Sequence, residues 1–298
     1  MTPAAEARRQ HYAEFYDLAE HPAGATIVVG NCQAESLRIV LQSPEFPTVR
    51  IPPVHELTAE DLPHLDRLLS DVAFVISQPI KDDYRGFPLG TRQILARMAP
   101  TARGLTIPIV RYTGLHPFQA VIRDPALPEA PPVVDYHDVR ELARAAGLPL
   151  PESLGRAAVR AIGEDSLTEL RRREEVIDVA ISDLFVQPSF DLMRTINHPG
   201  NPVWLTLGER VLSALGSAAT VNDPGRPLLS SIIAPRESWV AAAWDLDTET
   251  SPDWVITGEP VTADAVQSAQ AAWYHEHPEF VARAVRRLAP TLERWRAA

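Results

Sequence analysis

The chain of 298 residues contains a single cysteine, Cys32, and a single lysine, Lys81. One cysteine cannot form an internal disulfide, and it excludes a zinc site built from several thiolates. Apolar runs such as residues 27–29 are far too short to span a bilayer, and residues 1–10 contain no apolar segment of the signal-peptide type. The sequence therefore predicts a cytoplasmic protein with no membrane insertion and no metal.

The net charge of the chain is -11. An acidic protein repels the phosphate backbone, so general nucleic-acid binding is excluded, whereas a local basic pocket is compatible with this charge. Hydrophobic residues make up 45% and charged residues 22%, as in ordinary globular proteins, and the length suffices for a sizeable core. We predict one catalytic domain over residues 1–298.

Short apolar segments alternate with helical patterns in the first half of the chain. Residues 26–29 are β-branched and are followed by Gly30, which is typical of a buried strand. Such alternation predicts βαβ units with a parallel sheet, in an α/β part of about 22–125. The predicted strands are 26–29, 48–54, 72–77 and 105–112, and the predicted helices are 4–20, 33–42 and 58–70.

Residues 126–298 have a mostly helical pattern. Prolines are frequent between residues 117 and 151, which predicts a long surface excursion with a short helix at 138–146. Structure in 236–257 is not assigned. The fold class is thus α/β, with a parallel-sheet N-terminal half and a mostly helical C-terminal half. Further helices are predicted at 152–187, at 203–217 and at 262–297, where Pro278 separates two helices or starts the second.

The segment Gly30-Asn31-Cys32-Gln33 joins the first predicted strand to the following helix. Ligands of parallel sheets bind outside the carboxyl ends of the strands, and a helix N-terminus stabilises negative charge. Cys32 is therefore a candidate nucleophile, and the N–H groups around it are candidates for binding an oxyanion. Gly30 permits a tight turn, while Asn31 and Gln33 can donate hydrogen bonds to a carbonyl oxygen. The alternative is an ordinary Gly-Asn turn in which Cys32 only packs.

A nucleophilic cysteine needs a base, and two of the nine histidines are candidates. His116 comes just past the fourth predicted strand, at the carboxyl edge of the sheet. His198 lies between Asn197 and Pro199, in a loop without apolar periodicity that is suited to presenting a base. For each of them, an ordinary loop histidine is the alternative.

A third cluster begins where the third predicted strand ends. Its cations can bind phosphates, and its other polar groups can bind substrate. The alternative is a polar loop with a helix cap at Thr91. The candidate cofactor-binding cations of this cluster are Lys81, Arg85 and Arg92, and its substrate-binding candidates are Gln78 and Tyr84. Arg111, a further cofactor-binding candidate, and Tyr112, a further substrate-binding candidate, end the fourth predicted strand and are expected to face the same crevice. Asn197, beside His198, is the remaining substrate-binding candidate. In a parallel sheet these strand ends are expected to converge at one edge.

Together these motifs resemble the WcbI-type polysaccharide biosynthesis proteins, over roughly residues 25 to 205. The matching pieces are Gly30-Asn31-Cys32-Gln33, Gln78-Pro-Ile with Tyr84-Arg85 after it, Tyr112-Thr-Gly-Leu-His116-Pro117, and Asn197-His198-Pro199. The family is regarded as capsular polysaccharide acetyltransferases that bind coenzyme A.

This resemblance implies that Cys32 belongs to the active site, assisted by His198 and His116. It implies acetyl-CoA or another acyl-CoA as the donor. Because the chain has no Gly-rich phosphate loop, a coenzyme A pocket would depend on Arg and Lys side chains and on helix N-termini. The Pro-rich segment at 125–132 departs from the family and leaves the acceptor open.

The order of strand, Gly-Asn-Cys and late His-Pro loop is also distantly similar to the SGNH-type esterases, which have serine where Cys32 stands. Those enzymes have an aspartate three residues before the histidine, a position occupied here by Thr195. Asp191, seven residues before His198, is a weaker match. This likeness therefore implies a Cys–His dyad rather than a triad.

Three hypotheses follow. The first, which we favour, is a CoA-dependent acyltransferase, an O-acetyltransferase that acts on a sugar or related hydroxylated acceptor in polysaccharide or glycoconjugate biosynthesis. The second is an esterase or thioesterase with water as acceptor. The third is a non-catalytic ligand-binding protein in which Cys32 is buried. The expected partner is a small-molecule or glycan acceptor, and self-association is left open.

Overall fold

The computed structural model describes residues 2–296, so the ends of the predicted 1–298 domain and of the predicted helix 262–297 lie outside the described residues. The chain forms two compact units, each treated separately below. Unit 1 comprises residues 1–110, 171–183 and 200–229, and unit 2 comprises residues 111–170, 184–199 and 230–298.

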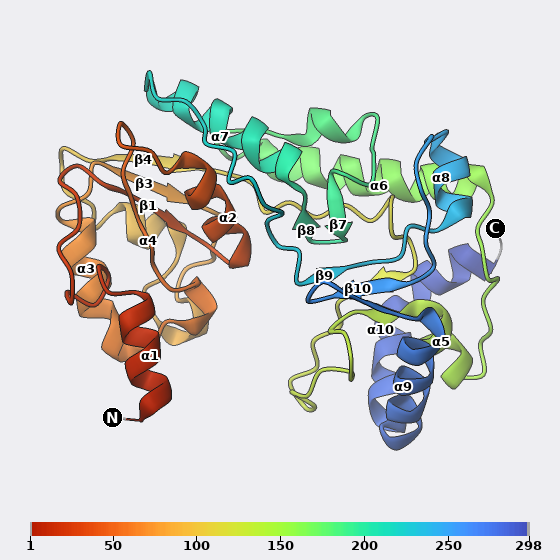
Figure 1. The fold of residues 1–298 in the computed structure, drawn as a ribbon. Helices are drawn as coiled ribbons and strands as arrows, with labels where there is room; N and C mark the ends of the chain where they lie inside the picture. Colours follow the sequence, from red (N-terminus) through yellow and green to blue (C-terminus); the bar gives the residue numbers. More distant parts are fainter. Residues whose placement is uncertain (1, 297–298) are drawn as a thin grey trace. The chain divides into compact units, whose positions relative to one another are not determined.

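Unit 1 contains a four-stranded parallel sheet in the order β2-β1-β3-β4 (Figure 1). The chain leaves β1 on one side to form β2 and returns on the other side to form β3, so the strand order reverses between β1 and β3. A reversal of this kind opens a crevice at the carboxyl ends of the two strands, where ligands of open α/β sheets bind. The strands are β1 (Thr26–Val29), β2 (Thr48–Val49), β3 (Phe74–Ser77) and β4 (Arg103–Thr106).

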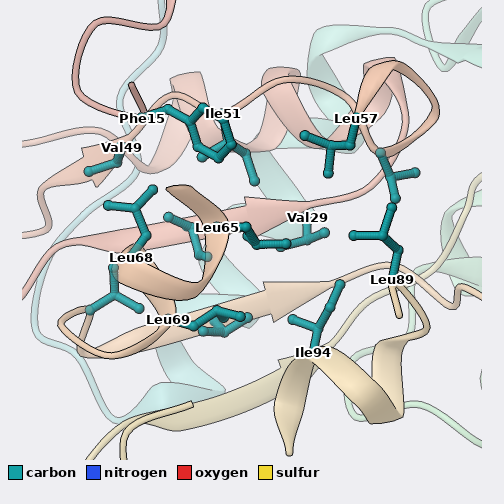
Figure 2. Close-up of a cluster of buried hydrophobic side chains, with 14 of the residues drawn as sticks. Phe15, Val29, Val49, Ile51, Leu57, Leu65, Leu68, Leu69, Leu89 and Ile94 are labelled. Atoms are coloured by element: carbon teal, nitrogen blue, oxygen red, sulfur yellow. The ribbon is translucent and has the colours of Figure 1, made fainter. Parts of the chain in front are cut away.

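One face of this sheet packs on α3 (Leu62–Leu69) and α4 (Thr91–Leu95). Side chains alternate along a strand, so Ile27 and Val29 share this face and meet Leu65 and Ile94 in one core (Figure 2). Leu65, Leu68 and Leu69 of α3 recur at helical spacing and are fully buried, and Leu62 packs against them partly buried. This core holds β1 and β3 rigidly in register.

On the sheet's other side, α2 (Cys32–Leu41) packs on β1, and α7 (Asn201–Leu215) packs on α2. Gly208 of α7 permits this approach, because a Cβ there would lie 3.3 Å from the side chain of Val40. α2 is therefore held between the sheet and α7. Its N-terminus lies next to the carboxyl end of β1, because only Gly30 and Asn31 separate the two elements.

Three predicted elements of unit 1 were too long. The second strand stops at Val49 instead of residue 54, since Pro52 and Pro53 cannot donate to a strand ladder. The fourth runs over 103–106 rather than 105–112, and Pro108 follows it. α1 (Pro3–His11) ends well before residue 20; residues 12–18 form turns, and Asp17 is left-handed with φ 60°. The other predicted strands and helices of this half are confirmed to within a few residues.

Unit 2 combines short antiparallel strands with helices. Pro278 starts α10, which confirms the predicted division of 262–297, and α5 confirms the helix at 138–146. The predicted helix at 152–187 is shorter, and 236–257 contains both a helix and a strand. α6 (Arg156–Glu174) begins in unit 2, and its residues from Arg171 on belong to unit 1. The other helices and strands of unit 2 are β5 (Gln119–Ala120), β6 (His137–Asp138), α5 (Val139–Ala145), β7 (Met193–Thr195), β8 (His198–Pro199), β9 (Ile232–Ile233), α8 (Ser238–Trp244), β10 (Trp254–Ile256), β11 (Glu259–Val261), α9 (Ala263–Glu276) and α10 (Pro278–Arg296).

Within residues 2–296, no helix combines the length and apolar character needed to cross a bilayer. The mixed α/β class and the parallel sheet predicted from the sequence are confirmed. The distant SGNH likeness and the single catalytic domain stay predictions.

The α3 core gives a direct stability test. Leu65 is fully buried, whereas Leu18 is 51% exposed in a turn. We expect Leu65→Ala to lower the free energy of unfolding by about 2–5 kcal/mol through lost burial and a cavity. The matched control Leu18→Ala should change it by less than about 0.5 kcal/mol. Urea unfolding followed by circular dichroism measures both, and equal effects would contradict the assigned core.

Candidate functional site

The turn after β1 is held by Gln78 from the end of β3. The backbone N–H of Asn31 donates to Oε1 of Gln78 at 2.9 Å. Gly30 allows this approach, because a Cβ at that position would lie only 2.8 Å from Cδ of the Gln78 side chain. The sequence thus needs glycine at position 30 for close packing of a neighbouring side chain.

Asn31 caps α2 and defines where the helix starts. Its backbone is extended, with φ -84° and ψ -162°, and its side-chain oxygen accepts the N–H of Gln33 at 2.9 Å. Its carbonyl accepts the N–H of Ala34 at 2.9 Å. Cys32 is therefore the first helical residue, as predicted, at the positive end of the helix dipole.

The two glutamines predicted to bind substrate are buried and bonded to the protein. Nε2 of Gln33 donates to the carbonyl of Val110 at 2.7 Å, and Oε1 of Gln33 accepts the Val110 N–H at 3.0 Å. Nε2 of Gln78 donates to Oε1 of Gln33 at 3.2 Å and to the carbonyl of Pro108 at 3.4 Å. Both are 1% exposed. These amides join the ends of β1 and β3 to the segment after β4, which makes them positioning residues.

Cys32 is partly exposed and lines a pocket of about 250 Å³ in unit 1. Tyr12, Glu35, Arg38 and Arg50 line the same pocket. Burial raises the pKa of the Tyr12 hydroxyl, and the carboxylate of Glu56 raises it further. The only thiol of the chain thus opens into a concave, polar environment, which argues against the alternative that Cys32 is merely buried.

Glu35 joins two guanidinium groups within this pocket. Arg38 binds its carboxylate with two hydrogen bonds, of 2.7 and 3.0 Å, and Nε of Arg50 lies 2.9 Å from it. Two cations and one carboxylate leave a net positive charge beside Cys32. Neither arginine was predicted as a site residue from the sequence. Arg50 had a usable signal, since it follows the second parallel strand and must lie at the same sheet edge.

A second pocket of unit 1, of about 290 Å³, lies at the same turn. Gly30 and Asn31 line both pockets, and Gln78, Lys81 and Tyr84 line the second. The structure therefore brings Lys81 and Tyr84 to the Gly30 turn, as the convergence of strand ends predicted. Their contact with substrate or cofactor stays a prediction.

Arg85 and Arg92 are placed differently from Lys81. Arg85 donates to the backbone carbonyl of His55, and exposed Arg92 pairs with Asp82. Neither lines the two pockets at the Gly30 turn. Hydrogen bonding to Asp82 raises the pKa of the fully exposed Arg92 guanidinium. Thr91 is the first residue of α4 rather than its cap.

Arg111 and Tyr112 belong to unit 2 and do not end the fourth strand, which stops at Thr106. Arg111 lines a separate pocket of about 310 Å³ in that unit. Tyr112 is fully buried, its ring centroid lies 4.9 Å from that of Phe185, and burial raises the pKa of its hydroxyl. Tyr112 therefore packs in the interior of unit 2, whereas Arg111 is exposed.

His116 is buried in unit 2. Its Nε2 lies 3.3 Å from the carbonyl of Met193, and its exposure is 3%. Burial lowers the pKa of His116 to about 4, although hydrogen bonds to the backbone of Met193 and Pro235 oppose this. The imidazole is therefore neutral at pH 7, and its burial makes it a weaker base than an exposed histidine.

His198 lies in β8, whose short pairing with β7 forms a tight hairpin in unit 2. Its backbone N–H donates to Oγ1 of Thr195 at 3.2 Å, and Tyr136 donates to Oδ1 of Asn197 at 2.7 Å. Burial lowers the pKa of His198 to about 4, with a further contribution from Arg194. Within residues 2–296, its Nδ1 is buried and has no hydrogen-bond partner.

Thr195 occupies the position at which SGNH esterases have an aspartate, and Asp191 is the weaker match for that aspartate. Thr195 holds the backbone of His198, as described above, and Oγ1 of Thr195 also donates to Tyr136 at 2.8 Å. Asp191 is exposed and pairs with Arg236 at 3.8 Å. The roles of His116 and His198 as bases stay predictions. Among the described residues, no group of three or more His, Cys, Asp or Glu side chains is arranged to hold a metal.

Comparisons with known proteins agree with this architecture. The family described as polysaccharide biosynthesis enzyme WcbI matches residues 25–220, a range that contains the whole parallel sheet and both candidate histidines. Among curated proteins, none matches the chain.

One solved structure shares the fold, with a TM-score of 0.76 and 18% identity over 92% of this chain and 99% of that chain. It is of WcbI, described as a novel polysaccharide biosynthesis enzyme, in the native form without a disulfide bond between coenzyme A and one of its cysteines. At this identity, the likeness shows the fold.

The Gly30 turn predicts a specific coupling between two residues. Gly30→Ala should destabilise the protein by about 1–3 kcal/mol, because the new Cβ displaces the buried Gln78 side chain. In a Gln78→Ala background the same substitution should cost at least about 1 kcal/mol less. Denaturant unfolding of the four proteins gives this coupling; additive effects would contradict it. Gly155→Ala, where a Cβ meets open space, is the control.

Unit 2 should lose stability in mild acid. His116, His137 and His198 have pKa values of about 4 when folded against an ordinary 6.5, so between these values the unfolded chain binds protons that the folded chain does not. The contribution of each neutral histidine to the free energy of unfolding is complete above pH 6.5 and is lost as the pH falls towards 4. For a fully buried histidine this loss is about 3 kcal/mol.

Thermal unfolding between pH 8 and pH 4 tests this pH dependence. The melting temperature should fall below pH 6.5, and His116→Gln should flatten that fall without changing the profile between pH 7 and 8. An unaltered profile in the variant would show that His116 does not couple folding to protonation.

Proposed function

The chain belongs to the WcbI family of polysaccharide biosynthesis enzymes, and from this premise we propose that it is a coenzyme A-dependent acyltransferase. The proposed donor is acetyl-CoA or another acyl-CoA, and the proposed acceptor is a hydroxyl group of a sugar or related molecule. The cysteine of the Gly30 turn is the proposed catalytic residue.

One observation carries the proposal: Cys32 is the first residue of α2 and opens into a pocket beside two guanidinium groups. A thiolate is favoured at a helix N-terminus and near arginine. The turn also lies between the ends of β1 and β3, where the strand order reverses. A nucleophile and an attraction for anions thus occur together at the edge where open α/β sheets bind ligands.

The proposed reaction has two steps. Sγ of Cys32 attacks the thioester carbonyl carbon of the donor, the bond from this carbon to the coenzyme A sulfur breaks, and coenzyme A leaves as a thiolate that takes up a proton. The acceptor hydroxyl then gives its proton to a base and attacks the Cys32 thioester, which forms the ester and releases the Cys32 thiolate.

Direct transfer, with backbone N–H groups binding the oxyanion, is the other route. The N–H groups of Asn31, Gln33 and Ala34 already donate to protein oxygens. Both routes form a tetrahedral oxyanion, so in either of them these three groups bind the oxyanion only by giving up those hydrogen bonds. The position of the Cys32 thiol at the start of α2 is what favours the covalent route.

The phosphates of coenzyme A need cations. Arg38 and Arg50 line the Cys32 pocket, and Lys81 lines the second pocket at the Gly30 turn. We propose these three residues for the coenzyme, with Arg50 the best placed, because its side chain is 38% exposed while Arg38 is 16% exposed and bound to Glu35 and Thr48. Arg85 and Arg92, which lie outside both pockets, are not included.

Calorimetric titration with coenzyme A, together with a turnover assay, tests the function. We expect binding by the wild type, about tenfold weaker binding for Arg50→Ala through loss of a charged contact, and less than about twofold change for the exposed control Arg92→Ala. Cys32→Ala should retain coenzyme A binding and lose acyl transfer by at least about 10³-fold.

One outcome would contradict the covalent route, and another would contradict the acyltransferase activity itself. Full turnover by Cys32→Ala would eliminate the covalent route and leave direct transfer. No coenzyme A binding by folded wild-type protein would eliminate the acyltransferase, and release of free acid from an acyl ester without any acceptor would then identify a hydrolase.

A further inference from the structure

Leu229 lines the Cys32 pocket of unit 1, and all the other residues that line this pocket come from residues 12–53. Leu229 ends the segment of residues 216–229, which follows α7 and belongs to unit 1. Its side chain adds to an apolar part of the pocket wall that the arginines and Glu35 do not explain. The apolar side chains of this wall are those of Val28, Ala34, Ile51, Pro52, Pro53 and Leu229.

The backbone of Leu229 is left-handed, with φ 48°. This conformation is disfavoured for a residue with a Cβ, whereas glycine adopts it without steric penalty. It persists only where the surrounding contacts impose it, and such positions are frequent at ligand sites. The presence of leucine at position 229 is therefore better explained by its side chain in the pocket than by the course of the backbone.

Hydrogen bonds to two helices hold the segment that leads to Leu229. Oδ1 of Asn201, at the start of α7, accepts the N–H of Leu228 at 2.9 Å, and its Nδ2 donates to the carbonyl of Arg226 at 2.9 Å. The N–H of Asn222 donates to a backbone carbonyl near the end of α2 at 2.7 Å. The residue before Leu229 is thus fixed, and the half-buried Leu229 side chain is held at the pocket.

The size of the pocket limits what Cys32 can carry. An acyl group bonded to Sγ of Cys32 lies in this pocket, because the thiol opens into it. The volume of about 250 Å³ equals roughly eight water molecules. At roughly one water volume per non-hydrogen atom, an acetyl group takes about three of these and a hexanoyl group about seven. A short acyl group therefore leaves room for the end of the coenzyme, and a long one does not.

We propose that Leu229 is a specificity-determining residue, whose side chain limits the group carried on Cys32 to chains of about four carbons or fewer. That this group is an acyl group rests on the proposed function. The size limit itself concerns the space beside the thiol, so it is measurable without coenzyme A and without an acceptor.

Labelling with alkyl methanethiosulfonates measures this space, and Cys32 is the only thiol of the chain that can react. Sγ of Cys32 attacks the sulfur that bears the alkyl group, a disulfide bond forms, and methanesulfinate leaves. The rates with the methyl and the hexyl reagent are followed by mass spectrometry of the full chain, and each is divided by the rate of N-acetylcysteine. On this scale the wild type should react with the hexyl reagent at least about tenfold more slowly than with the methyl reagent.

Variants of Leu229 test whether this side chain sets the limit. Leu229→Gly should bring the two rates to within about threefold of each other, whereas Leu229→Met, which keeps the volume, should retain the difference. Glycine suits the left-handed backbone, so Leu229→Gly should stay folded, which circular dichroism checks. Val133→Gly is the matched control, because Val133 of unit 2 is also left-handed, with φ 74°, and does not line the pocket. It should leave the ratio of the two rates unchanged.

Equal rates of the wild type with both reagents would overturn the size limit. A folded Leu229→Gly variant with the same ratio as the wild type would overturn the role of Leu229. A parallel calorimetric titration with coenzyme A keeps this proposal apart from the proposed function. Coenzyme A binding together with labelling that ignores chain length contradicts only the size limit, and length-selective labelling that depends on Leu229 without coenzyme A binding contradicts only the acyltransferase.

Discussion

The site depends on one set of hydrogen bonds between two buried glutamines and the backbone around them. Gln78 at the end of β3 accepts the N–H of Asn31 and donates to Gln33, and Gln33 forms two hydrogen bonds with Val110. These contacts satisfy backbone groups where the strands end and the sheet ladder can no longer do so. Three segments that are remote in sequence are therefore held at one point, and Cys32 follows immediately.

These hydrogen bonds fix the position of the Cys32 thiol. Because Asn31 is bonded on both its N–H and its side chain, the first turn of α2 has little freedom, and the thiol of Cys32 is presented at a defined place on the sheet edge. The same rigidity uses up N–H groups that would otherwise be available to an oxyanion. Beside this thiol lie the cations of Arg38, in α2, and of Arg50, in the segment after β2.

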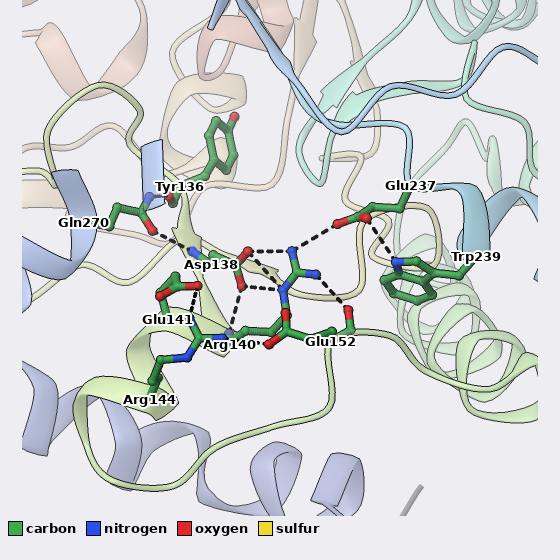
Figure 3. Close-up of polar contacts among 9 residues, drawn as sticks. All are labelled: Tyr136, Asp138, Arg140, Glu141, Arg144, Glu152, Glu237, Trp239 and Gln270. Carbon is green, nitrogen blue, oxygen red and sulfur yellow. Dashed lines mark hydrogen bonds and ion pairs between the residues drawn. The ribbon is translucent and has the colours of Figure 1, made fainter. Parts of the chain in front are cut away.

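Unit 2 shows how burial changes the chemistry of ordinary polar residues. His116 and His198 both have pKa values near 4, since the charged imidazolium would lose its hydration inside the protein. Arg140, in contrast, stays charged because the carboxylates of Asp138 and Glu237 surround it (Figure 3).

The sequence by itself determined the elements whose signals are local. The β-branched run before Gly30 and the leucine spacing of α3 specify a strand and a buried helix face, so β1 and α3 were predicted to within a few residues. The apolar spacing after Gly30 likewise predicted α2, and with it the place of Cys32 at the junction of strand and helix. Only the tertiary structure decided how far β2 and β4 extend, because ladder partners and prolines end them. It also decided that Gln33 and Gln78 are buried and that Arg50 rather than Arg92 lies beside Cys32, since contacts between remote residues have no pattern in a single sequence.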